Sequence, residues 1–361
     1  MTGDAGLARL AGSLRVRPGQ RPALLGGRPP LAARLLQGQP AEAAAQRLPL
    51  LYSLCGQAHR LTAELALQAA REGTAEASDA ARQALHAETR REHLRRIVLD
   101  WPGLLGGATA DPLALSAVAQ QGLDAWFEGS AQAWLDAWRE GPRQALLDWS
   151  ARGRHWLARL LRDCRDEAEA LLLPVHALPV APARLLAVEQ NLRQGDAFIR
   201  QPELDGQPCE TGAWTRAWEA HPQRHGNAWL RLGARLADLA ELSLEAPRPL
   251  ALGALAVGEC QALAWCETAR GLLLHRVHLE TGANGMQVCD YQVLAPTEWN
   301  LHPRGALAQA LEALPASGAS GRRQAELLLA AFDPCLAYRL EMDAGHSPEQ
   351  MTSDRGAPQH A

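Results

Sequence analysis

The chain has 361 residues, of which 47% are hydrophobic and 21% are charged, and its formal net charge is -4 at pH 7. This balance is typical of a water-soluble protein with room for one large domain or two ordinary ones, and it gives no electrostatic reason for nucleic-acid binding. All 36 basic residues are arginine, which disfavours Walker-type phosphate loops and Schiff-base chemistry, since both require lysine.

The first half of the chain is predicted to be a helical bundle. A short strand is expected over residues 14–17, and the glycine and proline cluster at 26–30 ends that region. Between about 41 and 71, apolar residues recur every three or four positions, which predicts one long helix that Pro49 kinks near its start. Further helices are predicted over 78–99, 112–139, 142–172 and 227–243.

The second half mixes strands and helices. Three prolines between Pro174 and Pro182 predict an irregular connector. Alternating apolar and polar residues predict two strands, joined by a hairpin connection, and helical spacing then returns. The strands are at 273–279 and 289–293, the connection at 281–285, and the helices at about 304–314 and 322–331. The predicted fold class is α+β, mostly α, with a helical bundle at about 40–173 and a smaller mixed or antiparallel β part at about 200–345.

The cysteines exclude two kinds of small scaffold. They are Cys55, Cys164, Cys209, Cys260, Cys266, Cys289 and Cys335, an odd number with no C-x-x-C pair. Neither a zinc ribbon nor a disulfide framework fits this spacing. The arginine-rich start lacks the apolar core of a signal peptide, and stretches such as 250–258 are too short to span a membrane. We therefore expect a cytoplasmic protein with no membrane span.

Two short motifs near the chain ends carry residues suited to metal chemistry. Cys55 and His59 are four residues apart, about one helical turn, so the predicted helix directs both toward the same neighbour. Pro334 is predicted to open a short helix with Cys335 in its first turn, where the helix dipole favours the thiolate. Taken singly, a buried Cys and a core His are the commoner interpretation of such residues.

Taken together, the motifs resemble those of the nickel–iron hydrogenase large subunit. That family carries C-G-x-C-x-x-x-H early and D-P-C-x-x-C-x-x-H late. Cys55 and His59 match the second Cys and the His of the early motif, and 333–335 match the start of the late one. Tyr52 and Tyr338 stand where the family has its other two cysteines, and Glu341 where it has the final His.

The middle of the chain extends the resemblance. Residues 206–212 followed by Arg216 are similar to G-x-P-x-E-x-G-P-L-A-R, and 267–271 followed by His275 to E-A-P-R-G-x-L-x-H. Residues 291–304 are similar to Y-Q-V-x-x-P-[ST]-x-W-N-x-x-P-R. Each motif singly carries a risk of chance agreement, but their common order from about 52 to 338 makes the resemblance specific.

The resemblance implies roles for particular residues. Arg270 and Thr297 would donate hydrogen bonds to two cyanides on an iron atom, since a buried anionic acceptor needs donors to offset its desolvation. Pro296 belongs to the same cofactor-binding motif as Thr297. Cys55 and Cys335 would hold the iron, with His59 supporting the sulfur of Cys55. The structural alternative is that Arg270 pairs with a carboxylate and Thr297 caps a turn.

The departures from the family argue against hydrogen turnover. Nickel in the family is held by four thiolates, and the phenols of Tyr52 and Tyr338 are poor substitutes. The family's early proton-relay Glu also has no counterpart, because no acid occurs between Asp4 and Glu42. We therefore expect no nickel and no enzyme activity. Because Glu341 replaces the His after which family maturation cuts, we expect the C-terminal segment to persist.

This combination resembles the HupK/HoxV type of hydrogenase assembly protein. The resemblance implies a single hydrogenase large-subunit-like domain over 1–361, without catalytic activity, that acts as scaffold or carrier for an Fe(CN)2(CO) fragment. The implied partners are the maturation proteins that build the iron cofactor and the large-subunit precursor. Two other interpretations stay open: a divergent active nickel–iron hydrogenase-like enzyme, and a metal-free interaction or regulatory protein of the maturation machinery.

Overall fold

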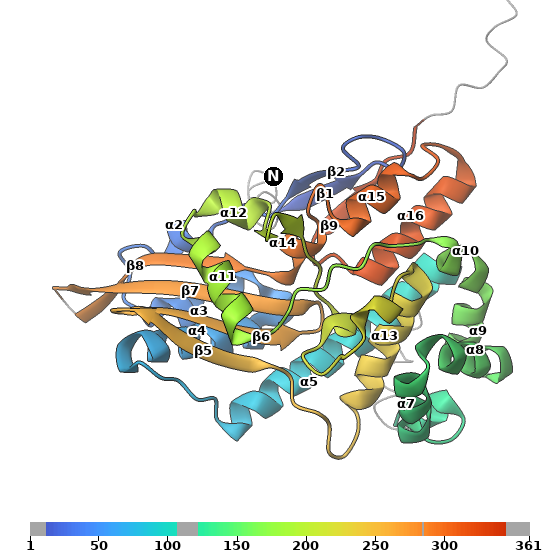
Figure 1. The fold of residues 1–361 in the computed structure, drawn as a ribbon, viewed down its shortest axis with the longest axis horizontal. Helices are drawn as coiled ribbons and strands as arrows, with labels where there is room; N and C mark the ends of the chain where they lie inside the picture. Colours follow the sequence, from blue (N-terminus) through green and yellow to red (C-terminus); the bar gives the residue numbers. More distant parts are fainter. Residues whose placement is uncertain (1–11, 107–121, 284, 344–361) are drawn as a thin grey trace, which may run out of the picture.

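The computed structural model describes residues 12–106, 122–283 and 285–343. The molecule is elongated, with a four-stranded sheet and its covering helices at one end and a helical bundle at the other (Figure 1). Helices predominate, so the predicted α+β, mostly α class is confirmed. Within the ranges given above, no helix is long and apolar enough to cross a membrane. A single domain over the whole chain stays a prediction.

The larger sheet is an antiparallel meander in the order β5-β6-β7-β8. Its strands are β5 (Leu252–Gly258), β6 (Gln261–Thr268), β7 (Gly271–Gly282) and β8 (Gly285–Leu294). The helices on its faces are α3 (Ala43–Leu51) and α4 (Gly56–Glu72) on one side, and α11 (Pro182–Leu192) and α12 (Asp196–Arg200) on the other. The alternation along β7 explains this layering, because Val277 packs with the α4 side and Leu274 with the α11 side.

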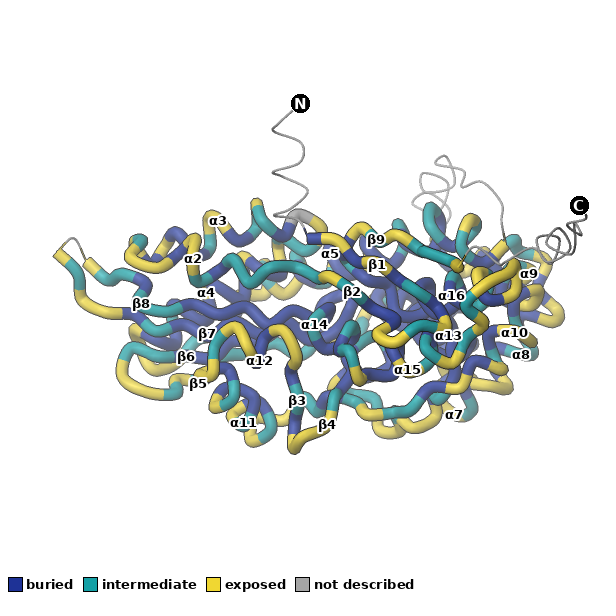
Figure 2. The backbone as a smooth tube through the Cα atoms, turned by 90° about the horizontal axis from the view of Figure 1, so that it is seen from above, coloured by how far each residue is buried: buried dark blue, intermediate teal, exposed yellow. Residues whose placement is uncertain are grey.

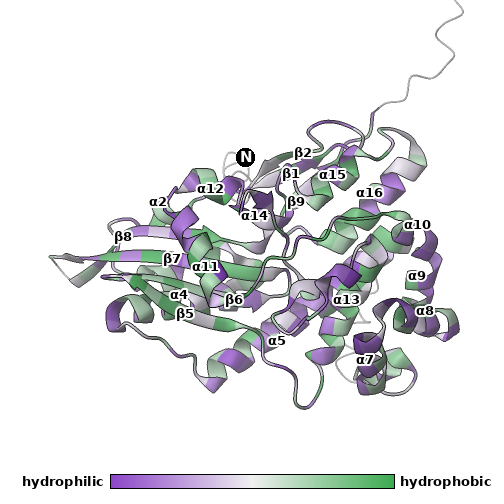
Figure 3. Ribbon diagram, in the orientation of Figure 1, coloured by the Kyte–Doolittle hydropathy of each residue, from purple (hydrophilic) through white to green (hydrophobic). Residues whose placement is uncertain are grey.

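The helical end is built around α13 (Ala228–Glu241), in which every residue is buried. The surrounding helices are α5 (Asp79–Arg95), α7 (Ala131–Glu140), α8 (Pro142–Arg152), α9 (Trp156–Asp163), α10 (Arg165–Ala170) and α16 (Gly318–Phe332). After α5 the chain continues in wider π-type turns at Arg96–Asp100 and Pro102–Gly106. Buried backbone runs through the middle of the molecule in Figure 2, while Figure 3 shows hydrophilic stretches on the outer helices α7 and α9.

The two ends of the described chain meet in a second, smaller sheet. Strand β1 (Ser13–Val16) pairs antiparallel with β2 (Leu24–Gly27) and parallel with β9 (Ala337–Leu340). Because of this pairing, residues 333–336, which precede β9, lie close to the start of β1. The remaining short elements are α2 (Ala32–Leu36), β3 (Glu203–Leu204), β4 (Gln207–Pro208), α14 (Pro296–Asn300) and α15 (Ala306–Glu312), with 3-10 turns at Ser53–Cys55, Asp124–Phe127, Ala213–Thr215 and Pro222–Arg224.

The predicted long helix at 41–71 is wrong in one respect, because it is broken at Tyr52. Helix α3 ends at Leu51, a 3-10 turn follows, and α4 begins only at Gly56. A Cβ atom on Gly56 would lie 3.4 Å from the carbonyl oxygen of Pro49, although seven residues of straight helix would separate them by roughly 10 Å along the axis. Cys55 precedes α4 in a non-helical conformation (φ -136°, ψ 41°), so the one-turn argument linking it to His59 does not hold.

The predicted short helix opened by Pro334 is also wrong. Asp333 adopts a left-handed conformation (φ 48°) that ends α16, and the chain passes through an irregular turn into β9. Cys335 therefore gains nothing from a helix dipole.

The predicted helix at 142–172 is three helices, broken at Gly153 and Cys164. Of the predicted helix at 112–139, only α7 is found, and 107–121 lie outside the described residues, as does the C-terminal segment after Asp343.

The other predicted elements are confirmed with small shifts of their ends. These are β1, α5, α13, β7, β8, α15, α16 and the irregular connector before Pro182. Strands β2, β5, β6 and β9 and helix α11 were not predicted. Strands β2 and β9 have only four residues each, too short to show a period.

Candidate cofactor-binding site

A buried cavity lies where α4, α5, the β6–β7 turn, α14 and the segment before β9 meet. All six residues predicted for the site line it: Cys55, His59, Arg270, Pro296, Thr297 and Cys335. Its other lining residues are Arg28, Glu88, Thr89, Glu92, Thr268, Ala269, Leu273 and Ala295. Segments from opposite ends of the chain are thus brought to one place, because β9 pairs with β1 and α4 packs on the sheet.

The two sulfur atoms differ in their surroundings. Cys335 Sγ lies 2.7 Å from Thr297 Oγ1, in a hydrogen bond whose donor is either group. Burial raises the pKa of the Cys55 thiol, the nearby Cys335 adds to this, and Arg270 opposes it. Burial therefore keeps Cys55 neutral even with Arg270 nearby, and binding of a soft metal ion would displace its proton. No group of three or more His, Cys, Asp or Glu suited to a metal ion is found among the described residues.

The N-terminus of α4 fixes Cys55 through a carboxylate. Glu88 accepts hydrogen bonds from the backbone N–H groups of Gln57 (2.8 Å) and Ala58 (3.0 Å), two of the free donors in the first turn of α4. Burial raises the pKa of Glu88, although these two hydrogen bonds work in the opposite direction. The carboxyl group thus holds the start of α4, and with it Cys55, against α5.

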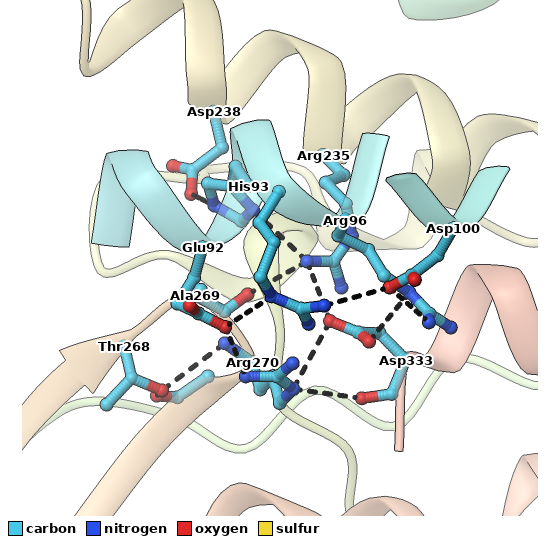
Figure 4. A network of polar contacts seen from close by, with 12 residues as sticks. Glu92, His93, Arg96, Asp100, Arg235, Asp238, Thr268, Ala269, Arg270 and Asp333 are labelled. Atoms are coloured by element: carbon cyan, nitrogen blue, oxygen red, sulfur yellow. Dashed lines mark hydrogen bonds and ion pairs between the residues drawn. The ribbon is translucent and has the colours of Figure 1, made fainter. Parts of the chain in front are cut away.

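Arg270 is placed by a tight turn and held by carboxylates. The following Gly271 has a φ of 122°, and a Cβ atom there would lie 2.5 Å from Thr211 Oγ1, so only glycine fits. Arg270 Nε lies 3.2 Å from the carbonyl oxygen and 3.3 Å from Oδ2 of Asp333, and Nη1 lies 3.4 Å from Glu92 Oε2 (Figure 4). Arg270 therefore pairs with carboxylates, as the structural alternative predicted, and it also lines the cavity. Its donation to a cyanide stays a prediction.

Asp333 is the centre of a buried ion cluster. Its carboxylate lies within 2.8 Å of Arg96 Nε, 3.1 Å of Arg235 Nη1 and 3.3 Å of Arg270 Nε (Figure 4). These are close ion pairs whose angles are not those of hydrogen bonds. Burial alone would raise the pKa of Asp333, but the three guanidinium groups outweigh it and lower the pKa to about 2. The cluster continues through His93, which lies 3.1 Å from Arg235 Nη1.

Two histidines and a tyrosine form a hydrogen-bonded chain that ends at the cavity. Tyr291 Oη lies 2.8 Å from His275 Nδ1, and His275 Nε2 lies 3.0 Å from His59 Nδ1. Burial lowers the pKa of His59 well below its ordinary value and that of His275 to about 3, so both rings are neutral. Burial raises the pKa of Tyr291 well above its ordinary value, so it keeps its proton.

The direction of this chain follows from the tyrosine. The hydroxyl of Tyr291 has no other hydrogen-bond partner in the described part of the chain, so it must donate to His275 or bury an unsatisfied O–H. His275 then donates from Nε2 to His59, and the remaining proton of His59 sits on its own Nε2. That atom is buried without a partner among the residues described, and it presents one N–H donor at the cavity.

The two tyrosines that replace family cysteines do different things. Tyr52 is buried and stacks on the ring of His59, with 3.9 Å between ring centroids. Tyr338 packs with the core of the helical end and is not among the cavity-lining residues. Neither tyrosine is among the residues that line the cavity.

Several residues of the site were not predicted. Arg28 extends over the Tyr52 ring at 4.8 Å, and its Nη2 lies 3.4 Å from the Cys335 carbonyl oxygen and 3.7 Å from Sγ. No sequence motif around Arg28 indicated that it would contact Cys335 and Tyr52. Glu298 follows Thr297 in the same sequence motif. Glu88 and Glu92 are four residues apart in a predicted helix, so they share one helix face. The sequence therefore contained a signal for all three positions. The acid-free N-terminal stretch therefore does not leave the cavity without carboxyl groups.

No family model matches the chain. It is 41% identical over 367 residues to a protein of Cupriavidus necator named hydrogenase expression/formation protein HoxV, covering 92% of this chain and 96% of that relative. It is 34% identical to a hydrogenase expression/formation protein HupK of Azotobacter vinelandii, over 87% of this chain and 91% of the relative. The HupK protein of Bradyrhizobium diazoefficiens is 32% identical, over 89% and 92%.

Among solved structures, the chain is similar to the Ni-Fe-Se hydrogenase of Desulfovibrio vulgaris Hildenborough in the reduced state. The TM-score is 0.55 at 14% identity, covering 86% of this chain and 92% of the other. The H2-activated NiFeSe hydrogenase of Dm. baculatum gives a TM-score of 0.51 at 13% identity, over 86% of this chain and 92% of the other. At such low identity the likeness shows the fold alone, and the large-subunit-like fold predicted from the motifs is confirmed.

Replacing Asp333 by Asn should destabilise the protein by about 3 to 5 kcal/mol at pH 7, because three buried arginines lose their shared counter-charge. The folded-state pKa lies below the ordinary value of about 4, so this stabilisation is present above pH 4 and is lost as the pH falls toward 2. Urea unfolding at pH 7 and pH 3 measures both effects. Asp100→Asn, at a half-buried carboxylate beside Arg95 and Arg96, is the control and should cost much less. Equal losses in the two variants would contradict the central role of Asp333.

Replacing Tyr291 by Phe should change the tautomer of His59. In the unaltered protein the proton is expected on Nε2, whereas in Tyr291→Phe the chain loses its fixed direction and both tautomers become populated. Nitrogen-15 NMR of labelled histidine distinguishes the two ring nitrogens, and the loss of one buried hydrogen bond should cost about 1 to 2 kcal/mol. A pure Nδ1–H tautomer in the unaltered protein would show that the chain runs in the opposite direction.

Proposed function

The chain belongs to the HoxV/HupK family of hydrogenase expression/formation proteins, and we propose that it serves hydrogenase maturation as a non-catalytic scaffold or carrier for an Fe(CN)2(CO) fragment, before delivery to the large subunit. The iron fragment is cargo in this proposal. The observation that supports it is that two thiols from opposite ends of the chain, Cys55 and Cys335, line one buried cavity together with directed hydrogen-bond donors.

The donors of the cavity suit the ligands of such a fragment. Cyanide is an anionic acceptor, and a buried one needs charged or polar donors. Arg270 is a fixed cation, Thr297 carries a hydroxyl at the wall, and His59 presents an N–H. Leu273, Ala295 and Pro296 supply an apolar wall against which a carbon monoxide ligand needs no hydrogen bond. Pro296 also begins α14, which sets the position of Thr297.

The sulfur atoms suit transfer better than permanent retention. Thiolates are soft donors that bind iron bearing strong-field ligands, and two of them leave the rest of the coordination to the cargo's own ligands. The permanent nickel of the related enzymes requires four thiolates, and here Tyr52 stacks on His59 while Tyr338 lies away from the cavity. A site with two sulfur ligands can release its cargo once a partner offers a larger number of sulfur ligands.

Partners and location belong to the same proposal. The cargo has to be supplied by the maturation proteins that build the iron group, and it has to be passed to the large-subunit precursor. We place these exchanges in the cytoplasm, where the precursor would be completed.

Cys55→Ala or Cys335→Ala should abolish the carbonyl and cyanide bands in infrared spectra of protein purified anaerobically from its native host. Thr297→Val keeps the side-chain shape but removes one donor to an anionic acceptor, which costs about 1.5 to 3 kcal/mol. That variant should shift the cyanide bands and weaken retention at least about tenfold. Cys289→Ala, at a half-exposed thiol of β8 outside the cavity, is the control and should keep the bands. A Cys55→Ala, Cys335→Ala double variant that still carries the fragment and supports maturation would leave a metal-free interaction partner as the better interpretation.

The protein should retain no stoichiometric nickel and should not oxidise hydrogen. The reason is geometric, because the described cavity offers two thiols, and the two phenols in place of the others do not complete a nickel site. Metal analysis and hydrogen-dependent dye reduction measure this. Tight nickel at one equivalent together with hydrogen uptake would restore the interpretation as a divergent enzyme.

A further inference from the structure

We propose that the outer edge of β2, with the groove beside it, is a docking surface for an extended, acidic segment of a partner protein, and that this segment reaches the cavity at Arg28. This inference rests on the proposed function only for the partner's identity, which is the protein that gives or takes the cargo. The groove and the strand edge stand on their own observations.

The first observation is an unpaired strand edge. Among the described residues, strand β2 has a neighbour on one side only, in the order β2-β1-β9. The Arg17 N–H donates to the Ala23 carbonyl at 2.8 Å, which fixes the alternation of the antiparallel pair. The backbone groups of Leu25 and Gly27 therefore face β1, and those of Leu24 and Gly26 face outward. Within the described ranges, Leu24 and Gly26 make no backbone hydrogen bond to any segment other than β1.

The second observation is a groove along that edge. Its volume is about 490 Å³, within the range of sites that hold ligands. Its apolar surface comes from Leu24, Pro30, Leu301 and Leu336. In Figure 2, β2 lies on the side of the small sheet that faces α12 and α14, so the groove separates the strand from these helices. An added strand would sit about 4.8 Å from β2 and fill this space.

The charge of the groove indicates the chemistry of the occupant. Arg28 and Arg200 line it, and Arg200 is largely exposed, with one weak ion pair to Asp196 at 3.7 Å. The only carboxyl among the described lining residues is that of Glu298, whose Oε2 atom is buried, and burial raises its pKa to about 7. The groove is therefore basic at neutral pH and favours a segment that carries carboxylates. Pairing with a second copy of this chain would bring two basic grooves together, which is unfavourable.

The groove is continuous with the candidate site. Arg28 and Thr297 line both the groove and the cavity. Because Arg28 also hydrogen-bonds the Cys335 carbonyl, a carboxylate in the groove that draws Arg28 outward would loosen its contact with Cys335. Docking and access to the sulfur are thereby linked. The short length of β2 and the prolines after it limit indiscriminate strand pairing, so recognition depends on the groove.

Hydrogen exchange of the full chain tests the docking surface. The probe is the purified maturation protein that carries the iron group, from the same host. The outward-facing amides of Leu24 and Gly26 should exchange fast in the free chain and at least about tenfold more slowly in the complex. Arg200→Glu should weaken the complex at least about tenfold, whereas Arg152→Glu, at another exposed helical arginine with an i,i+4 partner outside the groove, should leave it unchanged.

The other outcomes would overturn the proposal. Slow exchange at Leu24 and Gly26 in the free chain that is relieved by removing residues 1–11 would mean that the chain's own N-terminal segment fills the groove. Slowing that depends only on the concentration of this chain would mean self-association. Complex formation without any change at 24–27 would place the partner elsewhere. The Cys55→Ala, Cys335→Ala variant, which should lack the infrared bands, should still dock. Docking of the unaltered chain without such bands would refute the proposed cargo and leave the docking surface intact.

Discussion

The architecture depends on one buried carboxylate, that of Asp333, and the three arginines around it. Arg96 comes from the π-type turn after α5, Arg235 from α13 and Arg270 from the β6–β7 turn, so a single carboxylate ties together three elements from distant parts of the chain. Such a cluster is costly to desolvate and contributes less net stability than its distances suggest. Its value lies in position, because a buried charge tolerates few alternative arrangements. Cys335 follows two residues after Asp333, and Arg270 lines the same cavity, so a thiol and a cation of the site inherit their places from this cluster.

The same logic explains which parts of the site the sequence could predict. The six lining residues were found because their types recur in ordered motifs, and their convergence follows from the fold that those motifs imply. The break at Tyr52 was not predictable from periodicity, because Leu51, Leu54 and Ala58 keep helical spacing across it, while the packing of Gly56 against Pro49 requires the chain to turn. The turn after Asp333 was missed for a related reason. Pro334 favours a helix start locally, but pairing of β9 with β1 and the ion cluster decide its conformation.

The chemistry of the cavity is set more by neutral groups than by charges. Burial keeps the Cys55 thiol and the His59 and His275 rings uncharged, so the direction of each hydrogen bond matters more than any titration. Tyr291 supplies that direction from β8. Tyr52 stands where the family has a cysteine. Its ring stacks on that of His59 and thereby fixes the orientation of the imidazole. A tyrosine at a position where the resemblance implies a metal ligand thus orients a donor here, and under the proposed function this suits recognition of a ligated metal fragment.

Release is the harder physical problem for a carrier, because the features that recognise a buried anionic cargo also retain it. Two properties of this cavity ease that problem under the proposed function. Burial raises the pKa of the Cys55 thiol, so removal of the metal returns its proton and favours the empty state. Arg28 lies at the wall shared with the β2 groove, so a partner seated there acts on the same cation that contacts Cys335. Under this proposal, recognition is buried and fixed by the Asp333 cluster, while the contact of Arg28 with Cys335 lies at the edge, where a partner can reach it. This separation lets tight holding and transfer coexist in one site.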